Sequence, residues 1–326
     1  MNARALVPTN MHLSALLAVL VAGFSVVLGG DFLSLSTFQS IAYQLPELGL
    51  LALAMSLTLL SGGLNLAIVA IADVAGLTIA ALVTHPAVAA WGGGGEILAV
   101  AAGLATATTA GAVIGWLIGY RRVSPILATL GAMTLLNGLA LALTRGTVIS
   151  GFPSALLFLG NGALLGIPVP LVILGLAALA LEAVLQATPF GVAMRMIGSN
   201  EAATRFSGVD TRAVLFGVYT LSGLLSGLAA VVMVARFNSA KAGYGESYLL
   251  VTILAAVLGG IGPDGGVGRL SGLMIALVVL QVISSGMNLL GVSPYLTLAS
   301  WGAVLLAALG LPILQAKFAR GRGVRR

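Results

Sequence analysis

The chain has 326 residues, of which 59% are hydrophobic and only 7% are charged, and its mean hydropathy is +1.12. A water-soluble domain carries roughly 25% charged side chains, so this composition excludes a soluble protein. The net charge of +6 reflects loop charges that orient membrane helices, so no nucleic-acid partner is expected. There is no cysteine and there are only two histidines, so the sequence predicts neither a metal site nor a cofactor.

Apolar segments that can cross a bilayer follow one another along the chain. We expect one all-α transmembrane domain over residues 1–326, with about ten spans near 13–30, 46–61, 64–84, 95–119, 124–144, 169–187, 212–236, 247–263, 268–290 and 294–314. The least certain helix ends lie around 59–66, where Gly62-Gly63 can break one helix inside the membrane. Three tryptophans near span ends are interpreted as interfacial anchors, namely Trp91, Trp116 and Trp301.

The positions of Lys and Arg test this topology independently. With both termini in the cytoplasm, all but three of the fifteen basic residues fall on the inside, several of them in a basic tail at 315–326. Such a tail can lie against anionic lipid. The three exceptions, assigned to outside loops, are Arg145, Arg236 and Lys241.

Asp73 and Glu182 are acidic residues inside predicted spans, where ionisable groups usually face a cavity or a partner. Asp73 can line a solute path, or it can bond to backbone or to Thr78. Glu182 lies about one turn from the cytoplasmic end of its span and is expected to reach the interface.

A long polar loop on the inside, at about 188–211, is predicted to contain a short helix. Ser199 or Asn200 can cap it, Glu201 is favourable in its first turn, and Gly208 ends it. A second inside segment, from 259 to 269, is expected to form a tight turn. Its Gly259-Gly260 pair echoes Gly62-Gly63 and hints at an internal repeat.

The short helix has two faces. Ala202, Ala203 and Phe206 form a small apolar face, with Arg205 on the other side. Such a helix is either a docking element for a soluble partner or an amphipathic helix that rests on lipid headgroups.

The run from Gly198 to Val209 closely resembles the cytoplasmic coupling loop of the ribose/xylose/arabinose/galactoside-type ABC transporter permeases. Further segments resemble the same family in the same order, so the resemblance covers about residues 60 to 295. They are Ser124–Thr134, Gly166–Pro170, Thr188–Gly191, Val257–Gly260 with Gly265–Arg269, and Ser285–Ser293.

This resemblance implies the membrane subunit of a sugar ABC importer in the bacterial inner membrane. Such subunits pair with a second permease copy or a paralogue, dock on cytoplasmic ATPase subunits and receive solute from a periplasmic solute-binding protein. Alternating access would move a small polar solute, of which a monosaccharide is the leading candidate. The loop residues implied in ATPase coupling are Gly198, Asn200, Glu201, Ala202, Ala203, Arg205 and Gly208.

The chain itself has no phosphate-binding G-x-x-x-x-G-K-[ST] motif, so ATP hydrolysis is assigned to a partner and no catalytic residue is expected. Three positions depart from the family pattern, because Asn65, Asn137 and Val251 stand where the family commonly has charged residues. If those charges formed a pair or triad, their joint replacement is coherent, since a lone buried charge is costly.

Asn65, Asn137 and Asp73 are the residues assigned to the substrate pathway, because amides suit a neutral, hydroxyl-rich solute. Two other functions stay open from the sequence. One is an ion-coupled secondary transporter with Asp73 as its coupling acid, and the other is a membrane scaffold that transports nothing.

Overall fold

The computed structural model describes residues 10–303 and residue 306. Within this part of the chain, seven helices are long and apolar enough to cross a membrane, which confirms an all-α polytopic membrane protein. These helices are α1 (Asn10–Leu28), α2 (Leu35–Leu60), α5 (Gly93–Gly119), α6 (Pro125–Thr144), α8 (Val169–Ala187), α10 (Thr211–Phe237) and α12 (Leu270–Leu289).

The predicted spans 64–84 and 247–263 are shorter as helices than the sequence indicated. They correspond to α3 (Ile68–Val83) and α11 (Tyr248–Leu258). Eleven residues of helix cover only about 16 Å, roughly half of a bilayer core. The backbone that precedes α3 is not helical, and Asn65 and Ala67 within it are fully buried. Irregular backbone at membrane depth is tolerated where protein surrounds it, as it does here.

The ends of two further helices can be compared with the predicted span ends. The second span begins at Leu35 instead of near residue 46, and its helix continues through Pro46. It ends at Leu60, so the break expected around Gly62-Gly63 is confirmed. Residues 294–303 are helical, but the rest of the tenth predicted span and the basic tail lie outside the described residues.

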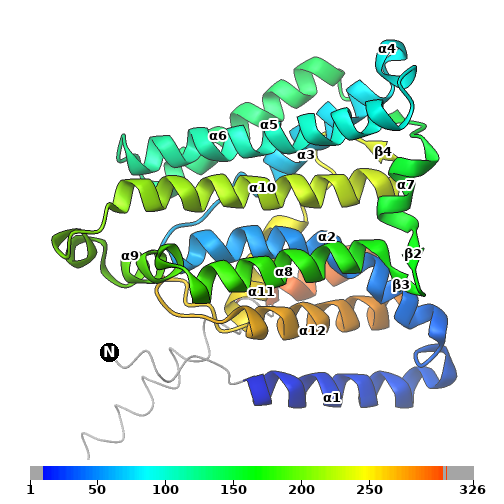
Figure 1. Ribbon diagram of the computed structural model, residues 1–326. Helices are drawn as coiled ribbons and strands as arrows, with labels where there is room; N and C mark the ends of the chain where they lie inside the picture. The colour runs from blue at the N-terminus through cyan, green and yellow to red at the C-terminus, as the bar shows by residue number, and fades with distance from the viewer. Residues whose placement is uncertain (1–9, 304–305, 307–326) are drawn as a thin grey trace, which may run out of the picture.

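The long helices lie side by side with similar axes, so the bundle has two ends (Figure 1). At one end, called the α9 end here, lie α9 (Pro189–Phe206) and the turn between α11 and α12. At the other, called the α7 end, lie the short elements α4 (Pro86–Ala89), α7 (Ser154–Asn161), β1 (Ile149–Ser150), β2 (Ala163–Leu164), β3 (Ile167–Pro168) and β4 (Ser239–Ala240). Antiparallel pairing joins β1 to β4 and β2 to β3. A short 3-10 helix, η2 (Gly29–Asp31), follows α1.

Small residues on α5 allow it to pack closely against α3 and α10. Every fourth residue of α5 from Gly103 to Gly119 is glycine or alanine, and all five are buried. A Cβ on Gly115 would lie 2.7 Å from the carbonyl oxygen of Phe216 in α10, which is closer than real contacts allow. Small residues let membrane helices approach closely, and here they place α10 in the centre of the bundle beside α2.

Candidate coupling helix and solute path

Two helical pieces form α9, and they meet at Asn200, whose backbone is extended (φ −164°, ψ 100°). The Oγ1 of Thr188 caps the first piece by accepting from the Gly191 N–H. The Oδ1 of Asn200 caps the second by accepting from the Ala203 N–H at 2.9 Å. Gly208 follows the helix with φ +85°. The predicted short, capped helix is therefore confirmed, with Asn200 as its cap.

The second piece of α9 presents its side chains to the outside of the protein. Phe206 is 88% exposed, and Ala202 and Ala203 are exposed beside it. Thr204 is the buried exception, and its Oγ1 donates to the Asn200 carbonyl. This piece lies at the extreme tip of the α9 end, beyond the ends of the long helices (Figure 1). A partner can therefore reach its apolar face without disturbing the bundle.

The first residue of the predicted coupling segment, Gly198, lies in a junction of three chain breaks. The Gly266 N–H, in the α11–α12 turn, donates to the Leu60 carbonyl at the end of α2 at 2.9 Å. A Cβ on Gly265 (φ +89°) would lie 2.6 Å from the Cα of Gly62 and 2.9 Å from the Gly198 carbonyl oxygen. We call residues 61–63, 198–199 and 264–266 the glycine junction. It connects α9 directly to the α2–α3 and α11–α12 breaks.

Arg195 strengthens this connection. It lies in the first piece of α9, and its Nη1 donates to the Gly268 carbonyl at 3.2 Å. The α11–α12 turn is therefore held to α9 at two places. A displacement of α9 would be passed to that turn.

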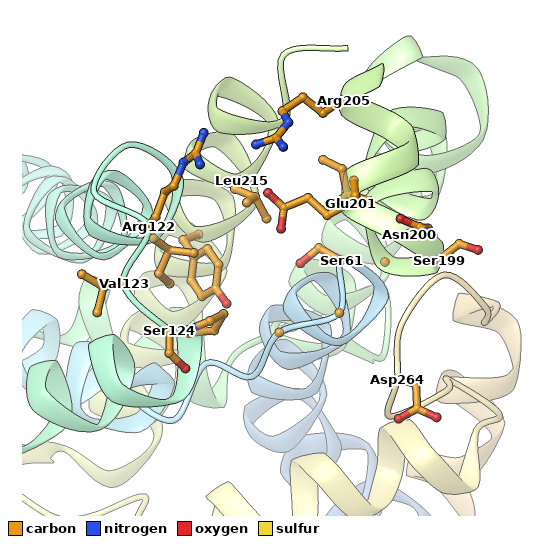
Figure 2. A pocket seen from close by; sticks show the side chains of 18 residues that line it. Ser61, Arg122, Val123, Ser124, Ser199, Asn200, Glu201, Arg205, Leu215 and Asp264 are labelled. Atoms are coloured by element: carbon orange, nitrogen blue, oxygen red, sulfur yellow. The ribbon is translucent and has the colours of Figure 1, made fainter. Parts of the chain in front are cut away.

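A cavity of about 700 Å³ opens beside the glycine junction (Figure 2). Glu201 and Arg205 of α9, Arg122 of the α5–α6 turn and Asp264 line it, so charges from three segments surround the space. No ion pair links these four side chains to one another. The residues predicted for coupling thus form one wall of an open, charged vestibule at the α9 end.

The residues predicted for the substrate pathway do not lie together. Asn65 is fully buried at the α2–α3 break, where its Nδ2 donates to the Ser222 Oγ at 3.0 Å. Its Oδ1 accepts from the Ala67 N–H at 3.1 Å, so both ends of the amide are used. Asn65 joins the break to α10.

Asp73 lies on α3, towards the α7 end. Its Oδ2 accepts from the Gly243 N–H at 2.8 Å, and only 6% of the residue is exposed. The alternative of a bond to backbone therefore describes its contact, whereas Thr78 bonds instead to the Val74 carbonyl. Asp73 thus fixes the loop that leads into α11.

Asn137 and Glu182, which were also singled out in the sequence, lie on the peripheral helices α6 and α8. Asn137 is half-buried on α6, and its Oδ1 has no partner among the described residues. Most of α6 is exposed, so a second subunit or lipid would cover it. Glu182 lies on α8 and accepts from the Gln186 side chain.

Sequence analysis missed one charged contact, the ion pair between Glu47 of α2 and Arg236 in the last turn of α10. Glu47 is fully buried, and Arg236 is 22% exposed. The Tyr248 hydroxyl, at the start of α11, donates to the Glu47 Oε2 at 3.1 Å. An isolated Glu within an apolar span signals a buried partner, and Arg236, the last residue of the predicted span 212–236, was one available cation. Sequence separation hid the pair, because the two residues are 189 positions apart.

The family profile described as branched-chain amino acid transport system / permease component matches residues 37–309. The chain belongs to this permease family. The matched residues include Glu47, α9 and the glycine junction.

Curated relatives show which permeases this protein is similar to. It is 36% identical over 296 residues to the ribose import permease protein RbsC of Escherichia coli (strain K12), with 90% of each chain covered. The RbsC protein of Bacillus subtilis (strain 168) is 35% identical over 284 residues, with 86% of each chain covered. The L-arabinose transport system permease protein AraH of Escherichia coli (strain K12) is 29% identical over 278 residues, or 85% of this chain and 83% of AraH. No solved structure matches.

These matches confirm the resemblance to sugar ABC permeases. The relatives are transport subunits and not enzymes, which supports a transport role for this multi-pass membrane protein.

Proposed function

We propose that this permease is the membrane-spanning subunit of an ABC importer in the bacterial inner membrane. A small polar solute, with a monosaccharide as the leading candidate, would reach it from a periplasmic solute-binding protein. Cytoplasmic ATPase subunits would dock at the α9 end, and a second permease copy or a paralogue would complete the pathway. The observation that carries the proposal is the exposed second piece of α9, which is joined through Gly198 to two helix breaks.

The charge distribution supports the orientation. Among the described residues, the α9 end carries most of the cations, in the α5–α6 turn, in α9, at the start of α10 and at the start of α12. Arg145 precedes β1 and Lys241 directly follows β4, and these two strands pair at the α7 end. Cytoplasmic loops are enriched in Lys and Arg, so the α9 end is assigned to the cytoplasm and both termini with it.

The contacts suggest how ATPase movement reaches the membrane. ATP-driven closure of the partner subunits would displace the second piece of α9. Gly198 and Arg195 would pass that displacement to residues 61–63 and to the α11–α12 turn. Since α2 and α11 end at these breaks, both helices would tilt, and the bundle would open alternately to each side.

The relatives' names refer to ribose and L-arabinose, whereas the family description refers to branched-chain amino acids. A neutral sugar is more compatible than an amino acid with the buried charges, because those charges already have partners within the protein. Glu47 and Arg236 neutralise each other, and the Asp73 carboxylate is bonded to a backbone N–H. A zwitterionic amino acid would need charged partners in the bundle, because burying an unpaired charge is costly.

Co-purification from native membranes in mild detergent tests the docking. The wild-type permease should bring down an ATPase subunit, and the double variant Glu201→Arg, Ala203→Glu should not. The matched control is Ala163→Glu, an exposed alanine in β2 at the α7 end, which should behave as wild type. If wild type and double variant both purify without an ATPase, from cells that express the neighbouring genes, the importer proposal fails and ion coupling through Asp73 becomes the leading account.

A further inference from the structure

A second cavity, of about 380 Å³, lies between α2, α11, α12 and the helix at 294–303. Its walls include Gln44 of α2, Tyr248 of α11, Gln281 and Asn288 of α12, and Tyr295 and Trp301. Small-molecule sites usually enclose roughly 300–1,000 Å³, so this volume suits a ligand at the small end of that range.

The cavity lies in the half of the bundle nearer the α7 end. Gln44 follows Tyr43, whose hydroxyl donates to the Gly162 carbonyl beside β2. Tyr248 begins α11, and Asn288 is one residue from the end of α12. The charged vestibule beside the glycine junction is at the opposite ends of these helices, so the two cavities are separate compartments of one bundle.

No charged side chain lines the second cavity within the described part of the chain. Its polar groups are amides and hydroxyls. The Gln281 Nε2 donates to the Gln44 Oε1 at 3.1 Å, and Gln281 is only 7% exposed. Because a primary amide has two donors and one acceptor oxygen, this contact leaves the Gln44 amide hydrogens and the Gln281 carbonyl oxygen for other partners.

Aromatic rings supply the rest of the wall. Trp301 is 8% exposed and lines the cavity, which shows that its interpretation as an interfacial anchor was wrong. Tyr295 lies on the same helical segment and is 84% exposed. Tyr248 is held in place by its bond to Glu47, which itself pairs with Arg236. The charged pair thus positions one wall of the cavity while no charge enters its lining.

We propose that this cavity binds a neutral, hydroxyl-rich molecule of monosaccharide size. Sugar hydroxyls both donate and accept, so they match the free donors of Gln44 and the free acceptor of Gln281. The Trp301 ring can cover the apolar C–H face of a sugar. Its described lining offers no cation for a carboxylate, so it disfavours amino acids. This inference rests on the proposed function, because the cavity would be a transient binding site for the transported solute in the half nearer the α7 end.

Trp301 allows a direct binding measurement. The chain has three tryptophans, so Trp91→Phe and Trp116→Phe leave Trp301 as the only indole of this chain, and emission of the same preparation with Trp301→Phe is subtracted as the background. The full permease, purified with any ATPase that accompanies it, is titrated with D-ribose, L-arabinose, D-xylose, D-galactose, L-leucine and D-ribose 5-phosphate. We expect a saturable change in Trp301 emission with at least one neutral sugar and no change with leucine or the sugar phosphate.

Variants assign the signal to the cavity. Gln281→Leu and Gln44→Leu should each weaken sugar binding about tenfold or more, because each leaves a sugar hydroxyl unpaired. The matched control is Gln186→Leu, an exposed glutamine on α8, which should bind as the parent does. The two cavity variants lie on different helices, so a folding defect in one leaves the other as a test.

Three results would overturn the inference. The first is no response to any neutral sugar, and the second is a response that both cavity variants retain. The third is quenching of Trp301 by a phospholipid with brominated acyl chains and no effect of sugars, which would identify the cavity as a lipid site. Co-purification of the ATPase is scored in the same preparations, so the proposed function can stand when the sugar site fails.

Discussion

The two cavities, one at each end of the bundle, differ in the charges that line them. At the α9 end, charged side chains surround an open vestibule, and three glycine-rich breaks touch one another beside an exposed helix. In the half towards the α7 end, the described lining of the 380 Å³ cavity is uncharged, and the one ion pair among the described residues is buried behind it. If the proposed function holds, movement and recognition are separated along the same helices, since α2 and α11 reach both regions.

The largest expected effect comes from breaking the buried ion pair. Glu47→Leu leaves Arg236 unpaired, and removing one partner of a buried pair costs roughly 3–5 kcal/mol, with a value near the lower limit here because Arg236 is partly exposed. The temperature at which the detergent-solubilised permease loses its monodisperse size-exclusion peak should fall markedly. The double variant Glu47→Leu, Arg236→Leu should recover part of that loss. A single variant as stable as wild type would show that the pair does not stabilise the outer half.

The next largest expected effect is a difference in stability between an alanine substitution in the glycine junction and one in an exposed turn. Gly265 and Gly151 both have φ +89°, but a Cβ on Gly151 would meet nothing within 4 Å. Each alanine substitution carries the same backbone strain of about 1–2 kcal/mol. Gly265→Ala adds a clash with Gly62, so we expect it to cost about 1–3 kcal/mol more than Gly151→Ala in the same thermal assay. Equal losses for the two variants would mean that the junction is not tightly packed.

Asp73 distinguishes structural support from ion coupling. Asp73→Leu leaves the Gly243 N–H unpaired and should cost about 1–3 kcal/mol, whereas Asp73→Asn keeps an acceptor oxygen and should be close to wild type in stability. Solute uptake should follow the same order. Loss of uptake in the stable Asn variant would instead identify Asp73 as a coupling acid.

The smallest effect concerns the cap of the coupling helix. Asn200→Ala removes the acceptor for the Ala203 N–H and should cost the second piece of α9 about 1 kcal/mol. Because this piece is exposed and local, global stability should hardly change, while the yield of co-purified ATPase falls several-fold. Asn200→Ser, which keeps a capping oxygen, is the control and should retain most of the ATPase. Equal ATPase yields from the Ala and Ser variants would argue against docking on this helix.

Local features could be read from the sequence, and long-range contacts could not. The end at Gly208 and the break after Leu60 depend on neighbouring residues and were predicted correctly, and Asn200 was one of the two caps predicted. The glycine junction joins segments far apart in the chain, so Gly62 and Gly265 could be noticed only separately. Trp301 was misassigned because its position near a predicted span end does not reveal that α2 and α12 enclose it. The short α11 was overestimated, since apolar turn residues such as Ile261 extend its hydrophobic pattern.

Uptake into proteoliposomes that contain the permease with its ATPase partner tests the central claim most directly. Labelled sugar and binding protein are supplied on the α7 side, and ATP on the α9 side. The account predicts uptake that requires ATP, is lost in the Glu201→Arg, Ala203→Glu variant and persists in Ala163→Glu. Uptake that proceeds without ATP or ATPase and is abolished by an uncoupler would contradict it.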